Sequence, residues 1–334
     1  MLGGPVALGL VSMNAIETDN LTKDYRIGFW RKRVRVLSGV NLVVRRGEIF
    51  GYLGPNGAGK TTTLKILMGL ARPTSGEARI LGQPLGDVRT KHQVGFLPEQ
   101  PYFYEYLTGR EILDFYGQLF GLHRSDRRER IETLARQLRI ESALDLPLRK
   151  YSKGMLQRIG LVQALLNDPG LVVLDEPMSG LDPIGRREVR DLLLGLKEEG
   201  KTVFFSSHVI PDVEMVCDRV GILVNGRLVA QGPLDEMLEA QVASIEVTVS
   251  RLPADLVEDL GHLLMTRPFM RGERLLLTVK DDAMLAELLP RLVEAHATVH
   301  SIIPQRESLE EYFLRHACAE PSRRARAETA PCLS

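Results

Sequence analysis

The sequence predicts an α/β protein whose first and larger part is built around a buried parallel sheet. Residues 54–61, Gly-Pro-Asn-Gly-Ala-Gly-Lys-Thr, match the pattern G-x-x-x-x-G-K-[ST] and lie between an apolar run and a helical pattern. The continuous apolar runs at 171–174 and 202–205 are typical of central parallel strands. Beyond residue 243, strand and helix patterns alternate, which predicts a second and smaller α/β domain.

The residues before the glycine-rich loop are predicted to form strands. Residues 16–18 and 36–44 alternate between apolar and polar side chains, and 47–53 is a short apolar run directly before the loop. The polar stretch 26–35 is predicted to be a loop or a hairpin tip. After the loop, apolar residues recur at helical spacing from 60 to 70.

The middle of the chain is predicted to be a helical subdomain at about residues 101–166. A loop is expected at 71–76, and a short buried strand at 94–98 ends at a proline. Apolar residues then recur at helical spacing, as at Ile112 and Tyr116.

The remainder of the first domain alternates between helix and strand. A helix is expected at 186–199, between the two central apolar runs. The segments 221–224 and 227–230 flank Asn225-Gly226, a strong signal for a β-hairpin. The first domain is therefore predicted to span residues 14–238.

The second domain is predicted at 243–316, after a break near Gln241. Its sequence shows no chemistry that can be named. Residues 1–13 and 317–334 are predicted to be a disordered extension and a disordered tail. The expected strands of this domain are 244–250, 274–280 and 297–303, and the expected helices are 254–264, 283–295 and 308–316.

Composition narrows the range of functions. The 43 basic residues balance 43 acidic ones, so there is no bulk electrostatic basis for binding nucleic acid or an anionic membrane, and no nucleic-acid partner is expected. Local clusters such as Arg31-Lys32-Arg33 with Arg35 are interpreted as solvated faces. The three cysteines lack metal-ligand spacing, which favours a reducing compartment. No stretch of about 18 apolar residues is present, so the chain is expected to be soluble by itself.

The glycine-rich loop predicts a phosphate site. Small residues let successive backbone N–H groups turn inward, and the following helix presents the positive end of its dipole. Lys60 is expected to reach the β- and γ-phosphates of a nucleotide, and the hydroxyl of Thr61 to hold Mg²⁺. The candidate phosphate-binding residues are Gly54, Pro55, Asn56, Gly57, Ala58, Gly59, Lys60, Thr61 and Thr62.

Two carboxylates follow the first central apolar run. Asp175 and Glu176 stand at the C-terminal end of the predicted strand, the edge at which α/β sheets place their ligands. Asp175 suits the coordination shell of Mg²⁺, and Glu176 suits polarisation of an attacking water.

Further motifs occur in a fixed order. Tyr151-Ser152-Lys153-Gly154 precedes a helical pattern, Ser179-Gly180-Leu181-Asp182 follows Glu176, and Ser206-Ser207-His208 follows the next buried strand. Tyr25 lies upstream of the phosphate loop. With these motifs, the chain resembles the ATP-binding subunit of ABC transporters over about residues 14–235.

The resemblance implies a fold and a set of roles. The fold would be a P-loop NTPase core of the ABC ATPase type, with a helical signature subdomain and a small C-terminal α/β appendage. Ser152 and Gly154 would contact the γ-phosphate, and His208 would be the switch histidine. Asp182 would belong to the D-loop, and Tyr25 would stack on adenine.

Two positions depart from the family's pattern. The signature loop is usually L-S-G-G-Q, so only Ser152 and Gly154 match its core positions. The family's glutamine that contacts Mg²⁺ and water is replaced by Glu99, with Gln100 next. Either side chain could serve, and a glutamate can ligate a hard cation.

The resemblance also implies an activity and partners. Lys60, Glu176 and His208 would be the catalytic residues of an ATPase that uses ATP and Mg²⁺. Two copies, or one copy and a related ATPase, would pair head to tail so that the signature loop of one closes on the ATP of the other. The dimer would power transport, most simply export, through a separate polytopic membrane permease, from the cytoplasmic face of the cell membrane. The alternatives are an importer ATPase and a soluble ATPase that acts on ribosomes or nucleic acid.

Overall fold

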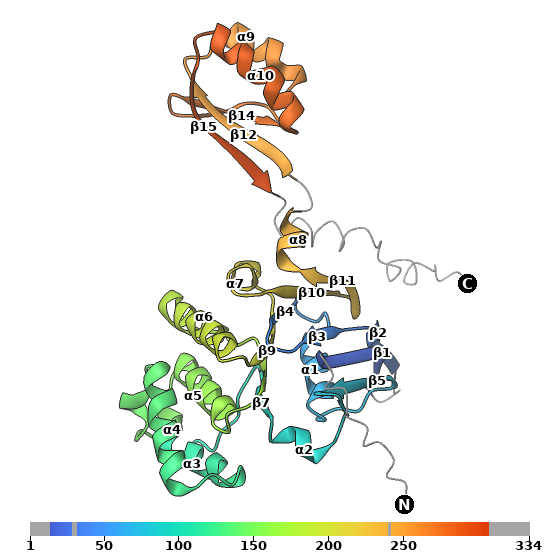
Figure 1. Ribbon diagram of the computed structural model, residues 1–334, viewed down its shortest axis with the longest axis vertical. Helices are drawn as coiled ribbons and strands as arrows, with labels where there is room; N and C mark the ends of the chain where they lie inside the picture. The colour runs from blue at the N-terminus through green and yellow to red at the C-terminus, as the bar shows by residue number, and fades with distance from the viewer. Residues whose placement is uncertain (1–13, 29–31, 240–241, 307–334) are drawn as a thin grey trace, which may run out of the picture. The chain divides into compact units, whose positions relative to one another are not determined.

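The computed structural model describes residues 14–28, 32–239 and 242–306. The chain divides into two compact units, residues 1–234 and 235–334, each with its own core (Figure 1). None of the helices in these ranges is long and apolar enough to cross a membrane. The predicted helix at 308–316 and the two predicted disordered ends lie outside the described residues.

A six-stranded sheet forms the centre of the first unit, in the order β11-β10-β4-β9-β8-β7. All neighbouring strands are parallel except β10 and β11, which form the predicted hairpin. Every residue of β4, β8 and β9 is buried, as the apolar runs predict. Because these three strands are parallel, their C-terminal ends meet at one edge of the sheet. The strands are β4 (Ile49–Leu53), β7 (Val94–Leu97), β8 (Leu171–Asp175), β9 (Thr202–Ser207), β10 (Arg219–Val224) and β11 (Arg227–Pro233).

Helices of the first unit accompany this sheet. The helix predicted at 186–199 begins three residues earlier, because the Asp182 side chain accepts a hydrogen bond from the Gly185 amide at 2.8 Å and a proline occupies the first turn. These helices are α1 (Lys60–Leu67), α2 (Val88–Lys91), α6 (Pro183–Glu198) and α7 (Ile210–Glu214). A further helix, α8 (Leu234–Glu239), begins at the boundary between the two units.

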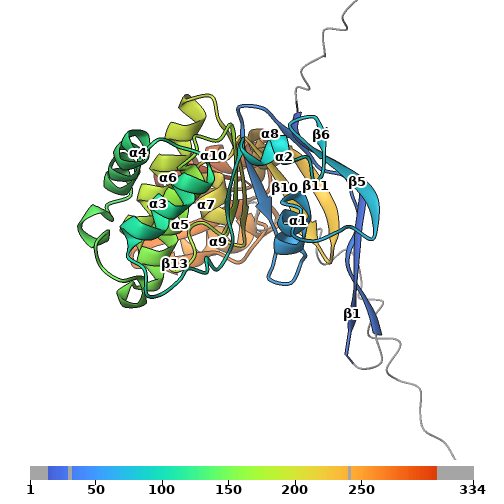
Figure 2. The same cartoon turned by 90° about the horizontal axis from the view of Figure 1, so that it is seen from below.

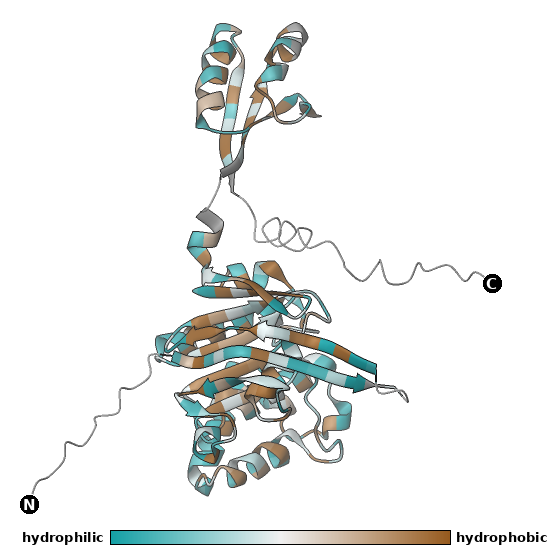
Figure 3. Ribbon diagram, turned by 90° about the vertical axis from the view of Figure 1, so that its right-hand side faces the viewer, coloured by the Kyte–Doolittle hydropathy of each residue, from teal (hydrophilic) through white to brown (hydrophobic). Residues whose placement is uncertain are grey.

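An antiparallel sheet in the order β2-β1-β5-β6, with β3 paired to β1, completes the core. Its buried residues, such as Ile16 and Leu37, share one cluster with Phe50 of β4 and Leu64 of α1. Figures 2 and 3 show its long β1–β2 hairpin extending beyond the rest of the unit. The strands are β1 (Asn14–Ile27), β2 (Lys32–Val40), β3 (Val43–Arg45), β5 (Ser75–Ile80) and β6 (Gln83–Pro84).

The strands of this region differ in extent from those predicted. The strand predicted at 16–18 is the long β1, and the one predicted at 36–44 is divided into β2 and β3. The polar stretch 26–35, predicted to be a loop or a hairpin tip, is the end of the β1–β2 hairpin, and the two strands include residues 26–27 and 32–35. Register shifts between Leu21 and Asp24 interrupt the alternation of β1, so the pattern ends long before the strand does.

The helical subdomain packs three helices beside the central sheet, on the side away from β1 and β5 (Figure 2). A capping box between Thr108 and Glu111 begins α3, and Arg127 of α4 donates to Asp114 of α3 at 2.7 Å. Two 3₁₀ turns, Glu141–Ala143 and Leu148–Lys150, lead to the signature segment. The helices are α3 (Gly109–Leu119), α4 (Arg124–Gln137) and α5 (Lys153–Leu165).

The second unit is a βαββαβ domain with a four-stranded antiparallel sheet in the order β13-β14-β12-β15. Val247 and Leu277 of the central strands pack with Leu288 and Leu292 of α10. The sequence did not reveal β13, which has only three residues. The elements are β12 (Val242–Ser250), α9 (Ala254–Asp259), the 3₁₀ turn Leu260–His262, β13 (Phe269–Arg271), β14 (Arg274–Val279), α10 (Asp282–Glu294) and β15 (Thr298–Arg306).

Candidate functional site

The glycine-rich loop joins β4 to α1 and leaves amide groups without partners. Gly59 has φ +111°, and a Cβ there would lie 2.7 Å from the Leu37 side chain, so the position requires glycine. The first helical hydrogen bond of α1 runs from the Thr63 amide to the Gly59 carbonyl. The amides of residues 60–62 therefore have no backbone acceptor, and they form the positive end of the helix dipole. This loop has the geometry of an anion site.

Lys60 is buried inside this loop, with 6 % of its surface exposed. Its Nζ donates to the carbonyl of Gly54 at 2.7 Å and to that of Pro55 at 3.3 Å. The same Nζ lies 3.2 Å from Oε1 of Glu176, on the turn after β8. The loop therefore curls around its own lysine and holds the ammonium group next to a carboxylate.

A buried serine organises the two carboxylates at the end of β8. Ser206 on β9 pairs with Asp175 in the strand register, and its Oγ donates to Asp175 Oδ1 at 2.6 Å. The Glu176 amide donates to the same Oγ at 3.0 Å. Burial raises the pKa of Asp175, and hydrogen bonds from Ser206 and Thr61 oppose that rise. Thr61 and Asp175, the predicted Mg²⁺ ligands, are therefore in contact.

Glu176 lies between a cation and a histidine. Its φ is +52°, a left-handed conformation that is uncommon for a glutamate and is found where the surrounding structure imposes it. Its Oε2 lies 2.9 Å from Nδ1 of His208, which follows β9, while Oε1 faces Lys60. The structure thus brings Lys60, Glu176 and His208 into one continuous chain of contacts.

Gln157 of α5 joins the signature helix to this cluster. Its Nε2 donates to the carbonyls of Glu176 at 3.2 Å and Pro177 at 3.0 Å, and the side chain is buried. Sequence reasoning gave Gln157 no role. The signal that could have identified it is a polar residue at helical spacing from Gly160 and Leu161, on a face of α5 that is buried.

Two predicted site motifs lie away from the cluster. Ser152 caps α5 by accepting from the Met155 amide at 3.2 Å, and Asp182 caps α6. Gly154 lies beside the Ser179–Asp182 turn, where an added Cβ would be 3.4 Å from Leu181. Within the described ranges, no hydrogen bond or ion pair joins Ser152 or Asp182 to Lys60.

Three other predicted residues are also outside the cluster. Tyr25 is half-buried on β1, with the ammonium of Lys23 4.8 Å from the centre of its ring. Glu99 and Gln100 are exposed in the bend after β7. In the part of the chain that the structure describes, no hydrogen bond or ion pair connects these three side chains to the phosphate loop.

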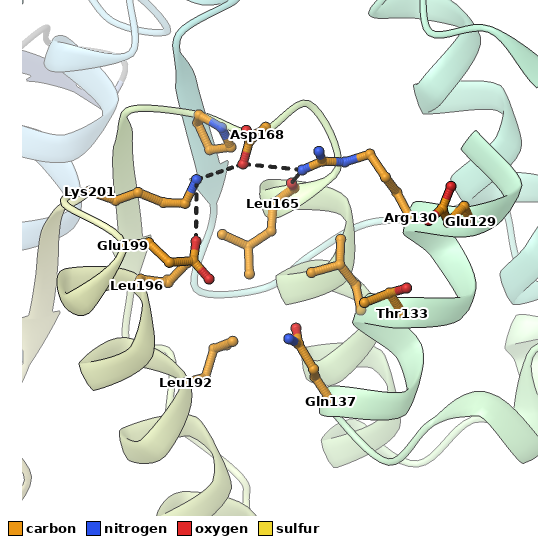
Figure 4. Close-up of a pocket in the computed structure, with 12 residues that line it drawn as sticks. Glu129, Arg130, Thr133, Gln137, Leu165, Asp168, Leu192, Leu196, Glu199 and Lys201 are labelled. Carbon is orange, nitrogen blue, oxygen red and sulfur yellow. Dashed lines mark hydrogen bonds and ion pairs between the residues drawn. The ribbon is translucent and has the colours of Figure 1, made fainter. Parts of the chain in front are cut away.

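Surface cavities lie both beside the cluster and elsewhere. One of about 100 Å³ is lined by Glu176 and His208 together with the Ser179–Gly180 turn. A second, of about 270 Å³, lies between α4 and α6, where Asp168 contacts both Lys201 and Arg130 (Figure 4). This second cavity contains none of the predicted site residues. A third, of about 260 Å³, lies between β7, α3 and α5, and its lining includes Pro98, Tyr102, Phe103, Tyr116, Phe120 and Gln163.

Comparisons with known proteins decide the family. Residues 37–179 match the family model described as ABC transporter. The chain is 44 % identical over 308 residues to an uncharacterized ABC transporter ATP-binding protein of Synechocystis, covering 91 % of this chain and 85 % of that one. The chain belongs to the ABC transporter ATP-binding proteins. The predictions of this family, of its P-loop NTPase fold and of an ATPase coupled to transport are therefore confirmed.

Two relatives of this ABC ATPase have more specific names. It is 34 % identical to the Nod factor export ATP-binding protein I of Ralstonia nicotianae, covering 93 % of this chain and 96 % of the relative. It is 33 % identical to the bacitracin transport ATP-binding protein BcrA of Bacillus licheniformis, covering 90 % and 96 %.

Solved structures show the same fold in the first unit. An ATP-binding subunit of an ABC transporter matches with a TM-score of 0.61 and 35 % identity, over 68 % of this chain and 92 % of the other. A dimeric ATP-binding cassette in a post-hydrolysis state, bound to ADP and phosphate, matches with a TM-score of 0.60 and 28 % identity, over 66 % and 98 %.

Proposed function

We propose that this ABC ATPase hydrolyses ATP at the cluster of Lys60, Glu176 and His208. The observation that carries the proposal is the continuous contact from the ammonium of Lys60 through the Glu176 carboxylate to the His208 ring, beside the free amides of α1. Lys60 and these amides would bind the β- and γ-phosphates. Glu176, held in place by Ser206 and Gln157, would orient the attacking water and accept its proton, and His208 would contact the γ-phosphate.

The residues present also fit a magnesium ion that is bound together with ATP. Thr61 and Asp175 are in hydrogen-bonding contact, and both offer the oxygen ligands that Mg²⁺ prefers. Across the described residues, no group of three or more His, Cys, Asp or Glu side chains could hold a metal. Phosphate oxygens and water would therefore supply most of the coordination, with Glu99 or Gln100 as a further ligand. When bound, the ion would neutralise the charge that develops on the transferred phosphoryl group.

We infer a head-to-tail dimer as the active form. Ser152 and Gly154 lie apart from Lys60 within one chain, so a partner subunit would have to bring its signature loop to the ATP. The dimeric cassette bound to ADP and phosphate, which shares the fold, supports this arrangement. Two identical subunits would form two equivalent sites. A related ATPase could take the place of one subunit. Tyr25 would stack on adenine, and Asp182 would act in the D-loop.

We further propose that the dimer powers export through a separate polytopic permease at the cytoplasmic face of the membrane. The name of the Nod factor export relative supports this direction, and the name of the bacitracin transport relative supports a role in transport. The cavity between β7, α3 and α5 offers a docking surface for the permease. Tyr102 lines this cavity and is 88 % exposed, and aromatic side chains are enriched at protein interfaces. Tyr106, four residues further along the chain, is 73 % exposed.

Two experiments test the proposal. Glu176→Gln removes the carboxylate charge but keeps the shape, so the variant should bind ATP and lose turnover by orders of magnitude in a phosphate-release assay. Turnover near the wild-type rate would refute the role of Glu176.

Purification of the tagged protein from detergent-solubilised membranes should recover a polytopic membrane protein at near-equal stoichiometry. Recovery with ribosomal or nucleic-acid partners instead would refute the transporter role, and an associated solute-binding protein would indicate import.

A further inference from the structure

The hairpin formed by β1 and β2 carries a local excess of positive charge. We call residues 23–28 and 32–35 the basic hairpin. It holds the five cations Lys23, Arg26, Lys32, Arg33 and Arg35 against the single carboxylate of Asp24, a net charge of +4 in a chain whose overall net charge is zero. The side chains of Arg33 and Arg35 are 63 % and 54 % exposed, and Arg26 and Lys32 are also exposed.

The strand register shows that this charge is not neutralised within the protein. Asp24 lies opposite Arg35, and its carboxylate accepts from Arg35 Nε at 2.9 Å and from Arg33 Nε at 2.7 Å. These hydrogen bonds, the one from Arg35 foremost, lower the pKa of Asp24. Arg26 lies directly opposite Arg33, and its side chain makes no hydrogen bond or ion pair within the described residues. Two like charges directly opposite each other on paired strands destabilise the hairpin. The fold gives no structural reason for this unfavourable pair.

The alternation of the strand separates this charge from the proposed nucleotide site. Successive residues of a strand point to opposite faces, so Arg26 and Tyr25 lie on opposite faces of the hairpin. The register places Arg33 and Arg35 on the face of Arg26, and Val34 on the face of Tyr25. If Tyr25 stacks on adenine, the arginine face points away from the ATP.

We propose that the basic hairpin binds the anionic phospholipid headgroups of a membrane surface. Clustered Lys and Arg side chains attract such surfaces, and the face of Arg26 carries three arginines against one carboxylate, a net charge of +2. Lys32 lies on the face of Tyr25 by the same register, and the ammonium of Lys23 lies 4.8 Å from the centre of the Tyr25 ring. Among the described residues of the basic hairpin, the face of Arg26 carries no aromatic side chain on which a nucleic-acid base could stack. This contact would hold the ATPase at the membrane independently of ATP and of the permease, and so it goes beyond the proposed function.

The test uses the full-length protein and co-sedimentation with vesicles. Wild type should bind vesicles of equal parts phosphatidylglycerol and phosphatidylcholine, should not bind vesicles of phosphatidylcholine alone, and should dissociate as salt is raised. The variant Arg26→Glu changes the local charge by two units. Each unit of positive charge near an anionic surface changes the affinity for that surface roughly fivefold, so the affinity of the variant for the anionic vesicles should fall about 25-fold.

The substitution separates binding from folding. The introduced carboxylate would face Arg33, so the cross-strand pair becomes attractive and the melting temperature should stay the same or rise. Arg128→Glu on α4 is the matched control, with the same change in charge at an exposed position, and its vesicle binding should equal that of wild type. Basal ATPase activity in solution should be unchanged in both variants, so failure of the lipid proposal is distinguishable from failure of the ATPase proposal.

Three results would overturn the inference. The first is equal binding of wild type and Arg26→Glu to the anionic vesicles. The second is equal binding of wild type to anionic and neutral vesicles. The third is displacement of the vesicles from the wild-type protein by an RNA oligonucleotide that binds Arg26→Glu more weakly than it binds wild type. That result would assign the basic hairpin to nucleic-acid binding.

Discussion

Replacing Ser206 with alanine tests how the two carboxylates are positioned. The Ser206 hydroxyl donates to Asp175 Oδ1 at 2.6 Å and accepts from the Glu176 amide at 3.0 Å. Asp175 and Glu176 are themselves buried, with 1 % and 8 % of their surfaces exposed, so water cannot readily replace the lost partner. Ser206→Ala removes one oxygen and leaves two buried polar groups without this partner.

The expected magnitude follows from these two lost contacts. Leaving a buried donor or acceptor unpaired costs about 1–3 kcal/mol. The Glu176 amide loses its acceptor, whereas Asp175 keeps the bond with Thr61, so the free energy of unfolding should fall by about 2–4 kcal/mol. If misplacement of the Glu176 carboxylate raises the activation free energy of hydrolysis by about 1–3 kcal/mol, kcat falls about 5- to 150-fold.

Urea denaturation and steady-state ATPase assays measure the two effects. Thr202→Val is the matched control, because Thr202 is a buried hydroxyl at the opposite end of β9 that accepts from the Gly47 amide at 2.9 Å. The control should lose stability and keep the wild-type kcat. The positioning argument is refuted if Ser206→Ala keeps the kcat of Thr202→Val, or if its stability equals that of wild type.

Two further predictions concern the charged groups of the site. Lys60→Ala should abolish tight ATP binding in calorimetry, whereas Lys65→Ala, an exposed lysine of the same helix, should leave it unchanged; equal affinities would refute the phosphate-site assignment. Asp175→Asn should stabilise the nucleotide-free protein at neutral pH. Burial raises the pKa of Asp175 in the folded state above its unfolded value of about 3.9. Below about pH 3.9 the side chain is protonated in both states, and the folded protein has its full stability. As pH rises through the folded pKa, the buried side chain must ionise and this stability is lost. The gap in melting temperature between variant and wild type should therefore widen from about pH 4 upwards, and parallel curves would contradict this account.

The central part of the site could be predicted because it follows from strand direction. The glycine-rich loop, Asp175 and Glu176, and His208 each follow a continuous apolar run, and parallel buried strands bring their C-terminal ends to one edge. That rule is sufficient to place Lys60, Glu176 and His208 together. The roles of Ser206 and Gln157 depend on strand register and on the direction in which one helix face points, and the spacing of residues within a sequence determines neither.

The antiparallel sheet was predicted less well, for a related reason. Its strands are recognised by alternation, and the register shifts between Leu21 and Asp24 break that alternation in β1. The sequence therefore leaves residues 26–35 as a loop or a hairpin tip, and its basic cluster as a solvated face. Only the register, which sets Arg26 against Arg33, shows that their charge is left uncompensated.

The contacts of Lys60 connect binding to catalysis in the proposed mechanism. In this structure the ammonium group has three oxygen neighbours, from Gly54, Pro55 and Glu176. A γ-phosphate at the end of α1 would compete with Glu176 for that ammonium group, because both are anions and Lys60 carries one positive charge. As the phosphate takes the lysine, Oε1 of Glu176 would be released from its 3.2 Å contact with Lys60 and would become available to accept a hydrogen bond from the attacking water. On this reasoning, the base is activated only in the presence of the substrate on which it acts.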